Sequence, residues 1–311
     1  MKIIDQIWTK IKEHKKIVCL AHINPDGDAY ASSIALYLLI KKMFPKKEVY
    51  CVNEKSKRFS WWNQYLHQET VNMITDSLVI VTDTATFSRI NSEFKEQAHS
   101  IIKIDHHPNS DKYGSLEWID EKASSTSEMI AFLIKILELK IDETIAEILY
   151  IGIVSDTNRF HYPVVSSTTF QVLSFLSSYN INLTSIYNKY YEQTVDTLKL
   201  KSLIFKNYIS NNKVISCCLK AELLKPLVVS AFTANEHVDL LANINDSKIW
   251  MMFSQTEING PIIGIFRSNY IKVNTVAQQF GGGGHDHYAG ATFQDWIQVN
   301  EIIEMYNLLV K

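Results

Sequence analysis

The sequence predicts an α/β protein with two domains, and three observations support this. In the first 190 residues, short apolar strands alternate with helices of apolar periodicity. From about residue 206 the pattern becomes one of strands, and Asn259-Gly260 between two of them is a strong hairpin signal. A chain of 311 residues, 46% of them hydrophobic, is long enough for two cores. We expect domains at residues 1–190 and 206–311, joined by a partly helical connector at 191–205.

The first domain is expected to begin with an amphipathic helix over residues 2–16, because its apolar residues fall on one face. Apolar runs predict strands at 17–23, 48–52, 78–81 and 100–104. Helical periodicity predicts helices at 29–43, 129–139, 143–154 and 168–178. The polar run from Ser124 to Glu128 resembles a capped helix start.

The second domain is expected to be built mainly from strands, at 214–219, 249–255 and 262–266, with a short helix at 273–280. Four consecutive glycines follow, from Gly281 to Gly284, and then His285. Backbone without Cβ atoms allows amides to approach an anion closely. Because this run lies between structured segments, we interpret it as an anion-binding segment rather than a linker.

Bulk composition limits the partners. A net charge of −2 and a pI of about 6.6 give no general attraction to nucleic acid or membrane, so an anionic substrate must be bound locally. No apolar run approaches the ~18 residues of a membrane span, and no signal-peptide core is present, so we expect a cytoplasmic protein with no membrane partner. The four cysteines have no CxxC spacing, which argues against a zinc-thiolate site or a disulfide.

The first candidate site follows the strand expected at 17–23. Residues 22–29 read HINPDGDA, and a long helix follows. In an α/β sheet, a turn between a strand and a helix lies at the carboxyl end of the strand, where ligands bind. The spacing of His22, Asp26 and Asp28 allows a curled loop to direct all three side chains into one pocket. We therefore predict that they bind metal.

Three more acidic groups stand at or just beyond the end of an apolar segment: Asp83, the triplet Asp105-His106-His107, and Asp156. A single aspartate after a strand is often only a helix cap. Asp83 is the third carboxylate in such a position, which favours a functional role. Because neighbouring side chains of an extended strand point to opposite faces, we expect His106 and His107 to have different roles.

The candidates together comprise four to five carboxylates and two to three imidazoles, without a thiolate. This donor set suits Mn²⁺ or Mg²⁺, with Co²⁺ as a further option, better than a thiolate zinc site. One ion needs far fewer ligands. A pair of ions about 3.5–4 Å apart, sharing a carboxylate, needs about this many and activates a water for attack on phosphorus. We therefore predict a two-metal hydrolase of phosphate esters.

The motifs at 22–29, at Asp83-Thr84-Ala85, at 105–107 and at Asp156 resemble the ordered motifs of the DHH phosphoesterase superfamily. Arg267-Ser268 and the run 281–285 resemble its associated C-terminal substrate domain. The resemblance spans nearly the whole chain and is nearest to the branch of nanoRNases and 3′-phosphoadenosine 5′-phosphate (pAp) phosphatases. It implies an N-terminal parallel-sheet DHH domain with helices on both faces, plus a smaller α/β substrate-binding domain.

The resemblance also implies a role for each site residue. One Mn²⁺ would be held by His22, Asp26 and Asp83. The other would be held by Asp28, Asp83, His106 and Asp156, so that Asp83 bridges the pair.

Outside the metal ligands, the resemblance implies that His107 faces the scissile phosphate and that Asp105 supports the histidines. The residues that would bind the substrate's other phosphate or its terminal nucleotide are Arg267, Ser268, Gly282, Gly283, Gly284 and His285. Tyr288 departs from the family pattern, because a small residue is usual there. This departure leaves the substrate preference open.

We therefore expect a phosphodiesterase that degrades very short RNA, including linear dinucleotides such as pApA, to mononucleotides, and that also dephosphorylates pAp. The modest charge favours short substrates, because a long strand requires a basic groove. A family-related inorganic pyrophosphatase and a catalytically silent nucleotide-binding module stay open as alternatives. The direction of attack on RNA also stays open, and the resemblance makes a homodimer an additional expectation.

Overall fold

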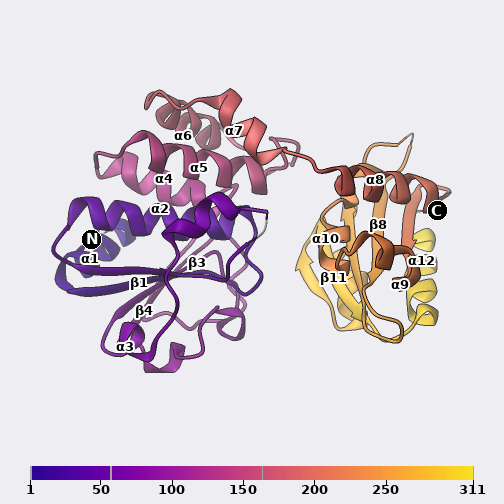
Figure 1. Cartoon of the computed structure of the whole chain (residues 1–311), viewed down its shortest axis with the longest axis horizontal. Coiled ribbons are helices and arrows are strands. Elements are labelled where there is room, and N and C mark those ends of the chain that lie inside the picture. Colours follow the sequence, from indigo (N-terminus) through magenta and orange to yellow (C-terminus); the bar gives the residue numbers. More distant parts are fainter. Residues whose placement is uncertain (1, 57, 163, 245, 311) are drawn as a thin grey trace. The chain divides into compact units, whose positions relative to one another are not determined.

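The computed structural model describes residues 2–56, 58–162, 164–244 and 246–310. The chain divides into two compact units, a first unit of Met1–Tyr191 and a second unit of Glu192–Lys311. Each unit has its own sheet covered by helices (Figure 1). The predicted α/β class is therefore confirmed.

The first unit contains a five-stranded sheet in the order β2-β1-β3-β4-β5, and all its pairings are parallel. Its strands are β1 (Lys16–Leu20), β2 (Glu48–Val52), β3 (Leu78–Thr82), β4 (Ser100–Asp105) and β5 (Leu116–Ile119). The sequence patterns predicted the first four but not β5. Because parallel strands all end at one edge, the segments that follow β1, β3 and β4 meet there.

Helices cover both faces of this sheet, but unequally (Figure 1). The larger core lies against α1 (Ile3–Glu13), α2 (Gly27–Met43), α4 (Thr126–Ile136) and α5 (Glu143–Asp156). A further layer, α6 (Ser167–Ser177) and α7 (Leu183–Tyr190), packs on these helices. The opposite face carries a smaller core beneath the single turn of α3 (Val71–Ile74).

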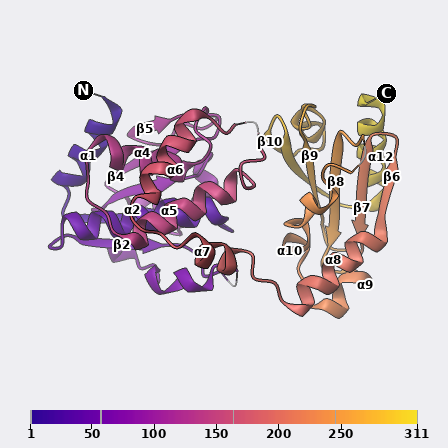
Figure 2. The same cartoon turned by 90° about the horizontal axis from the view of Figure 1, so that it is seen from above.

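The second unit contains a six-stranded mixed sheet in the order β10-β11-β9-β8-β7-β6 (Figure 2). Its strands are β6 (Tyr208–Asn211), β7 (Val214–Leu219), β8 (Ile249–Gln255), β9 (Ile262–Ser268), β10 (Gly283–His285) and β11 (Tyr288–Phe293). Strands β8 and β9 are antiparallel neighbours, as the Asn259-Gly260 signal predicts, and Asn259 has a positive φ of 65°.

Both faces of the second sheet are covered. One face packs against α8 (Val195–Asn207), α9 (Ala221–Leu224) and α10 (Ala231–Asn235), and the other against α11 (Asn274–Ala277) and α12 (Trp296–Leu309). Most of the segment expected as a connector belongs to α8, and Leu200 and Ile204 are buried in the second unit. Short 3-10 helices lie at Ser60–Tyr65, Phe87–Arg89, Lys95–Gln97, Lys225–Leu227, Val238–Leu241 and Gln278–Phe280. No helix within the described ranges has the length and apolar character needed to cross a bilayer.

The packing of α5 between α2 and α4 depends on Gly152. A Cβ atom at Gly152 would lie 2.0 Å from Ser127 Oγ and 2.7 Å from Ala31 Cβ. These contacts are shorter than van der Waals distances, so the three helices approach closely only because residue 152 has no side chain. The same three helices carry Asp28, Asp156 and the amides of the first turn of α4.

We expect Gly152→Val to lower the free energy of unfolding by about 2 kcal/mol, because the added side chain forces α5 away from α4 and α2. The measurement is urea unfolding followed by circular dichroism. Thr144→Val introduces the same residue at an exposed position of α5 and is expected to change the free energy by less than about 0.5 kcal/mol. Equal stability of both variants would contradict this account of the packing.

Candidate metal centre

The six predicted metal ligands meet at the carboxyl edge of the first-unit sheet. The segments after β1, β3 and β4 supply His22, Asp83 and His106, the start of α2 supplies Asp26 and Asp28, and the last residue of α5 is Asp156. Together with His107, they form three groups in which the possible ligand atoms lie within 4.8 Å of one another. The groups are His22, Asp26 and Asp83; Asp28, His106 and Asp156; and Asp83, His106 and His107.

Asp83 lies between the histidines. Its Oδ2 is 3.8 Å from His22 Nε2, whereas its Oδ1 is 3.4 Å from His106 Nε2. Asp83 is almost completely buried and has a positive φ of 52°, immediately after β3. Its two oxygens therefore face different histidines, which is the arrangement required of a carboxylate shared by two metal ions.

The rings of His22 and His106 are held in similar ways. Nδ1 of His22 lies 2.8 Å from the carbonyl oxygen of Ile23, and Nδ1 of His106 lies 3.4 Å from that of Ala123. An N–H donated to a carbonyl fixes the orientation of the ring and leaves Nε2 as a ligand atom. In both residues, Nε2 is the atom that faces the carboxylates.

The two aspartates of α2 are fixed by helix N-termini. Asp26 caps α2, with Oδ1 accepting from the amides of Asp28 and Ala29, and its Oδ2 lies 4.0 Å from His22 Nε2. The fully buried Asp28 accepts from the first amides of α4, those of Thr126 at 2.7 Å and Ser127 at 2.9 Å. Helix N-termini favour negative charge, so both carboxylates are stabilised where the sheet ends.

The buried carboxylates destabilise one another electrostatically. Burial raises the pKa of Asp28 well above its usual range, and the charges of Asp83 and Asp156 raise it further. Desolvation also raises the pKa of Asp156, to about 7. Asp83 differs, because the hydrogen bond with His106 and the nearby histidine charges outweigh burial and lower its pKa. A divalent cation would relieve this repulsion, so the oxygen and nitrogen donors present fit a divalent metal.

The expectation that His106 and His107 point to opposite faces is wrong. Strand β4 ends at Asp105, so strand alternation does not extend to the two histidines, and their ring centroids lie 4.6 Å apart. The rings still differ in their contacts. Nδ1 of His107 lies 2.8 Å from Oδ1 of Asp105, whereas Nε2 of His106 lies 3.4 Å from an oxygen of Asp83 and 3.4 Å from one of Asp156.

Lys103 is a site-supporting residue that the sequence analysis missed. It is fully buried, and its ammonium donates to the carbonyl of Ala85 at 2.9 Å, to Asn109 Oδ1 at 3.1 Å and to the carbonyl of Asp111 at 3.0 Å. Its Nζ also lies 3.9 Å from Asp105 Oδ2. The sequence did carry a signal for this residue, because Lys103 lies inside the apolar run from Ser100 to Ile104. A lysine buried in a strand is almost always paired with another polar group.

Two more polar residues contact the centre. The hydroxyl of Thr126 donates to Asp83 Oδ1 at 3.1 Å, and a guanidinium nitrogen of Arg89 lies 3.3 Å from His22 Nδ1. Arginine is scarce in this chain, with only four in total, and that scarcity is a sequence signal for Arg89. For Thr126, the sequence indicated only a capped helix start and not a contact with Asp83.

The residues predicted to bind substrate lie in the second unit. Arg267 and His285 are half-buried on β9 and β10. The hydroxyl of Ser268 donates to the carbonyl of Lys248 and accepts from the amides of Tyr270 and Ile271, so it is already used within the unit.

The glycine run is partly incorporated into the second-unit sheet, and its predicted anion binding stays a prediction. The amide of Gly282 donates to the carbonyl of Ala277, and Gly283 and Gly284 pair with β11 as part of β10. Strand β10 is the edge of the sheet, so its backbone pairs with a neighbouring strand on one side only.

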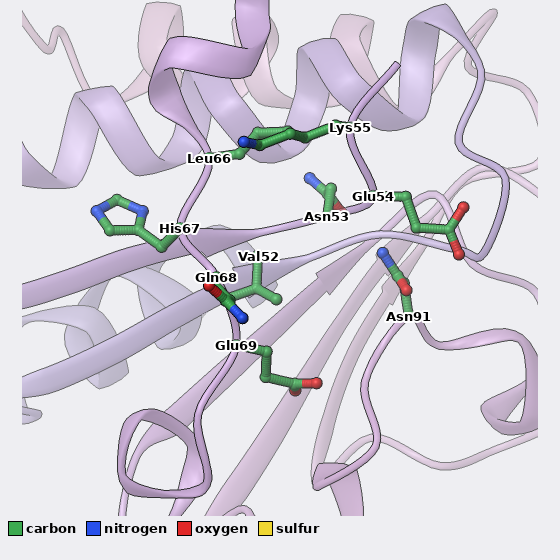
Figure 3. A pocket seen from close by; sticks show the side chains of 9 residues that line it. All are labelled: Val52, Asn53, Glu54, Lys55, Leu66, His67, Gln68, Glu69 and Asn91. Atoms are coloured by element: carbon green, nitrogen blue, oxygen red, sulfur yellow. The ribbon is translucent and has the colours of Figure 1, made fainter. Parts of the chain in front are cut away.

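A separate pocket of about 370 Å³ lies beside the end of β2 (Figure 3). No residue that the sequence analysis predicted for the site lines it. The lining residues are Val52, Asn53, Glu54, Lys55, Leu66, His67, Gln68, Glu69 and Asn91.

We expect Lys103→Met to lower the free energy of unfolding by about 3 kcal/mol, because it removes the buried positive charge that lies beside the Asp105 carboxylate. Asp105→Asn in the same chain removes that charge and is expected to restore at least half of the loss. Thermal and urea unfolding measure both variants, with the exposed Lys140→Met as the control. A double variant as unstable as Lys103→Met would contradict a charge interaction.

Comparisons with known proteins agree with this geometry. Residues 16–153 match the model of the DHH family N-terminal domain, and residues 225–311 match that of the DHHA1 domain. The bifunctional oligoribonuclease and PAP phosphatase NrnA of Bacillus subtilis is 33% identical over 97% of this chain and 96% of its own length. The protein of the same name from Mycoplasma genitalium is 30% identical over 96% of this chain and 95% of its own length.

A solved structure has the same fold. An exopolyphosphatase-related protein from Bacteroides fragilis superposes with a TM-score of 0.89 over 99% of this chain and 97% of its own, at 23% sequence identity. The family prediction made from the four ordered motifs is thus confirmed: the chain belongs to the DHH family and carries a DHHA1 domain at its C-terminal end.

Proposed function

We propose that this chain is a metal-dependent phosphodiesterase that degrades short oligoribonucleotides, including linear dinucleotides such as pApA, to mononucleotides and dephosphorylates pAp to AMP. The observation that carries the proposal is the position of Asp83, whose two oxygens face His22 and His106. The two relatives named oligoribonuclease and PAP phosphatase, each matched over nearly its whole length, support the substrate class.

The geometry supports a pair of divalent ions sharing Asp83. One ion would be held by His22, Asp26 and Asp83. The other would be held by Asp28, Asp83, His106 and Asp156. When bound, the pair supplies an activated water and neutralises charge on the phosphoryl oxygens. Mn²⁺ fits this oxygen-rich, nitrogen-containing donor set best, and Mg²⁺ and Co²⁺ are the alternatives.

His107 is the residue proposed to face the scissile phosphate. Its Nδ1 is held by Asp105, and its Nε2 is proposed to contact a phosphoryl or leaving oxygen. Asp105 fixes the ring, and Lys103 compensates the charge of Asp105. These contacts orient the imidazole before the substrate binds.

The second unit is proposed to bind the rest of the substrate. Arg267 is suited to a phosphate because a guanidinium offers two parallel donors. The guanidinium lies near the Tyr288 ring, and the Tyr288 ring lies beside that of His285. Ser268 contributes by shaping the turn after β9, since its hydroxyl is occupied there. Nucleotide turnover fits a cytoplasmic protein, and a homodimer is part of the same proposal.

The proposal predicts a substrate order. Full-length protein is incubated with a 5′-labelled RNA dinucleotide, an RNA of about 24 nucleotides, pAp and pyrophosphate, each with Mn²⁺, Mg²⁺ or a chelator. We expect fast cleavage of the dinucleotide and release of phosphate from pAp with metal, no reaction with chelator, and weak activity on the long RNA, because the chain has no excess positive charge.

Two other outcomes would replace the proposal. Pyrophosphate as the single good substrate identifies a pyrophosphatase. Nucleotide binding without turnover under any metal condition identifies a silent binding module.

We expect Asp83→Ala to lower kcat by more than about a hundredfold, beyond the 10–100-fold typical for loss of a group that only orients a ligand, because both ions lose a ligand. The dinucleotide assay measures kcat, and calorimetric titration with Mn²⁺ counts the bound ions. Asp246→Ala removes an exposed carboxylate and serves as the control. Activity within tenfold of the unchanged protein would refute the shared ligand.

A further inference from the structure

Four residues form one row across the second-unit sheet. Trp250 pairs with Arg267, Arg267 with Tyr288, and Tyr288 with His285. Directly paired residues of antiparallel strands project from the same face, so the row runs from β8 through β9 and β11 to β10. Trp250 is buried, whereas Arg267, Tyr288 and His285 are half-buried. The row therefore leads from the core to an accessible edge.

Tyr288 is the central contact of this row. The centroids of the Tyr288 and His285 rings lie 4.5 Å apart, and the guanidinium carbon of Arg267 lies 5.8 Å from the Tyr288 ring. A guanidinium within about 6 Å of an aromatic ring is attracted to it. The phenol therefore lies close to both the guanidinium and the imidazole.

The next row on the same face lacks side chains on the two outer strands. Gly283 and Gly290 are paired with each other, and each lies two positions from His285 or Tyr288 along its strand. A Cβ atom at Gly283 would meet no heavy atom of the described residues within 4 Å, and one at Gly290 would meet only the carbonyl oxygen of Gly264, at 3.1 Å. We call this bare backbone beside the rings the glycine shelf.

We propose that the glycine shelf binds the base of the substrate's terminal nucleotide, stacked against Tyr288, while Arg267 pairs with a phosphate of that nucleotide. The inference rests on the proposed function and specifies which part of the substrate the second unit recognises. A flat base can lie on the backbone of two glycines, which carry no side chains, and stack on the neighbouring Tyr288 ring. Stacking accepts any base, because every base has a π face.

The inference also explains why this position carries a tyrosine. A small residue at position 288 would leave Arg267 to bind phosphate without a neighbouring ring. With Tyr288 present, a ligand that has a base gains a contact that a bare phosphate or pyrophosphate does not. The row therefore selects nucleotides over inorganic phosphates.

The first test compares binding of AMP and ribose 5-phosphate to the full-length, metal-loaded protein by calorimetry. The two ligands differ only in the base. We expect Tyr288→Ala to weaken AMP roughly tenfold and to leave ribose 5-phosphate unchanged, whereas Tyr288→Phe keeps the ring and the affinity. Gly283→Val places a side chain on the shelf in open space and is expected to weaken AMP similarly.

The second test uses turnover of pApA and of two analogues that each lack one of its bases. For the unchanged protein, KM should rise for only one analogue, the one that lacks the shelf base. For Tyr288→Ala, KM should rise for pApA but not for that analogue, with kcat unchanged. Thermal unfolding of each variant checks that it is folded.

The outcomes separate this inference from the proposed function. Three results would each overturn the shelf. Tyr288→Ala could lose affinity equally for AMP and ribose 5-phosphate, it could lose no affinity for AMP, or the unchanged protein could bind the two ligands equally well. Base-dependent binding without turnover would leave the shelf standing and refute the phosphodiesterase. Turnover of pApA together with binding that does not depend on the base would support the phosphodiesterase and refute the shelf.

Discussion

The position of Asp83 is the constraint on which the first unit depends. One buried carboxylate must present its two oxygens to histidines that arrive from different strands. A parallel sheet makes this possible, since β1, β3 and β4 all end at the same edge. The left-handed backbone of Asp83 and the hydroxyl of Thr126 hold the carboxylate where the chain leaves β3. The predicted ligands Asp28 and Asp156 join this group because α2 and α5, which carry them, pack closely.

A second set of contacts keeps the two histidines of the triplet distinct. His106 donates to a backbone carbonyl and turns Nε2 towards the acids, whereas Nδ1 of His107 is occupied by Asp105. The ammonium of Lys103 lies beneath Asp105 and joins the loops after β3 and β4 through Ala85 and Asp111. A buried charge therefore serves both orientation and loop anchoring. Such pairs are costly to bury, which explains why so many hydrogen bonds converge on one lysine.

The two units divide the work in the proposed reaction. The first concentrates carboxylates that favour cations, and the second presents a guanidinium, an imidazole and a phenol in one row. In the proposed reaction, the first set hydrolyses the phosphate ester and the second set binds the nucleotide. The low net charge is consistent with this division, because a short substrate is bound by a few local contacts.

Sequence alone determined the α/β class, four of the five first-unit strands, the β8–β9 hairpin and the family, because periodicity and motif spacing are local properties. It also named the six residues that the fold brings together. Only the tertiary structure decided how His106 and His107 face Asp83, because β4 ends one residue before them. The burial of Lys103, the strand pairing of the glycine run and the row through Tyr288 arise from contacts between segments distant in sequence. No local pattern encodes such contacts, since they depend on which strands become neighbours.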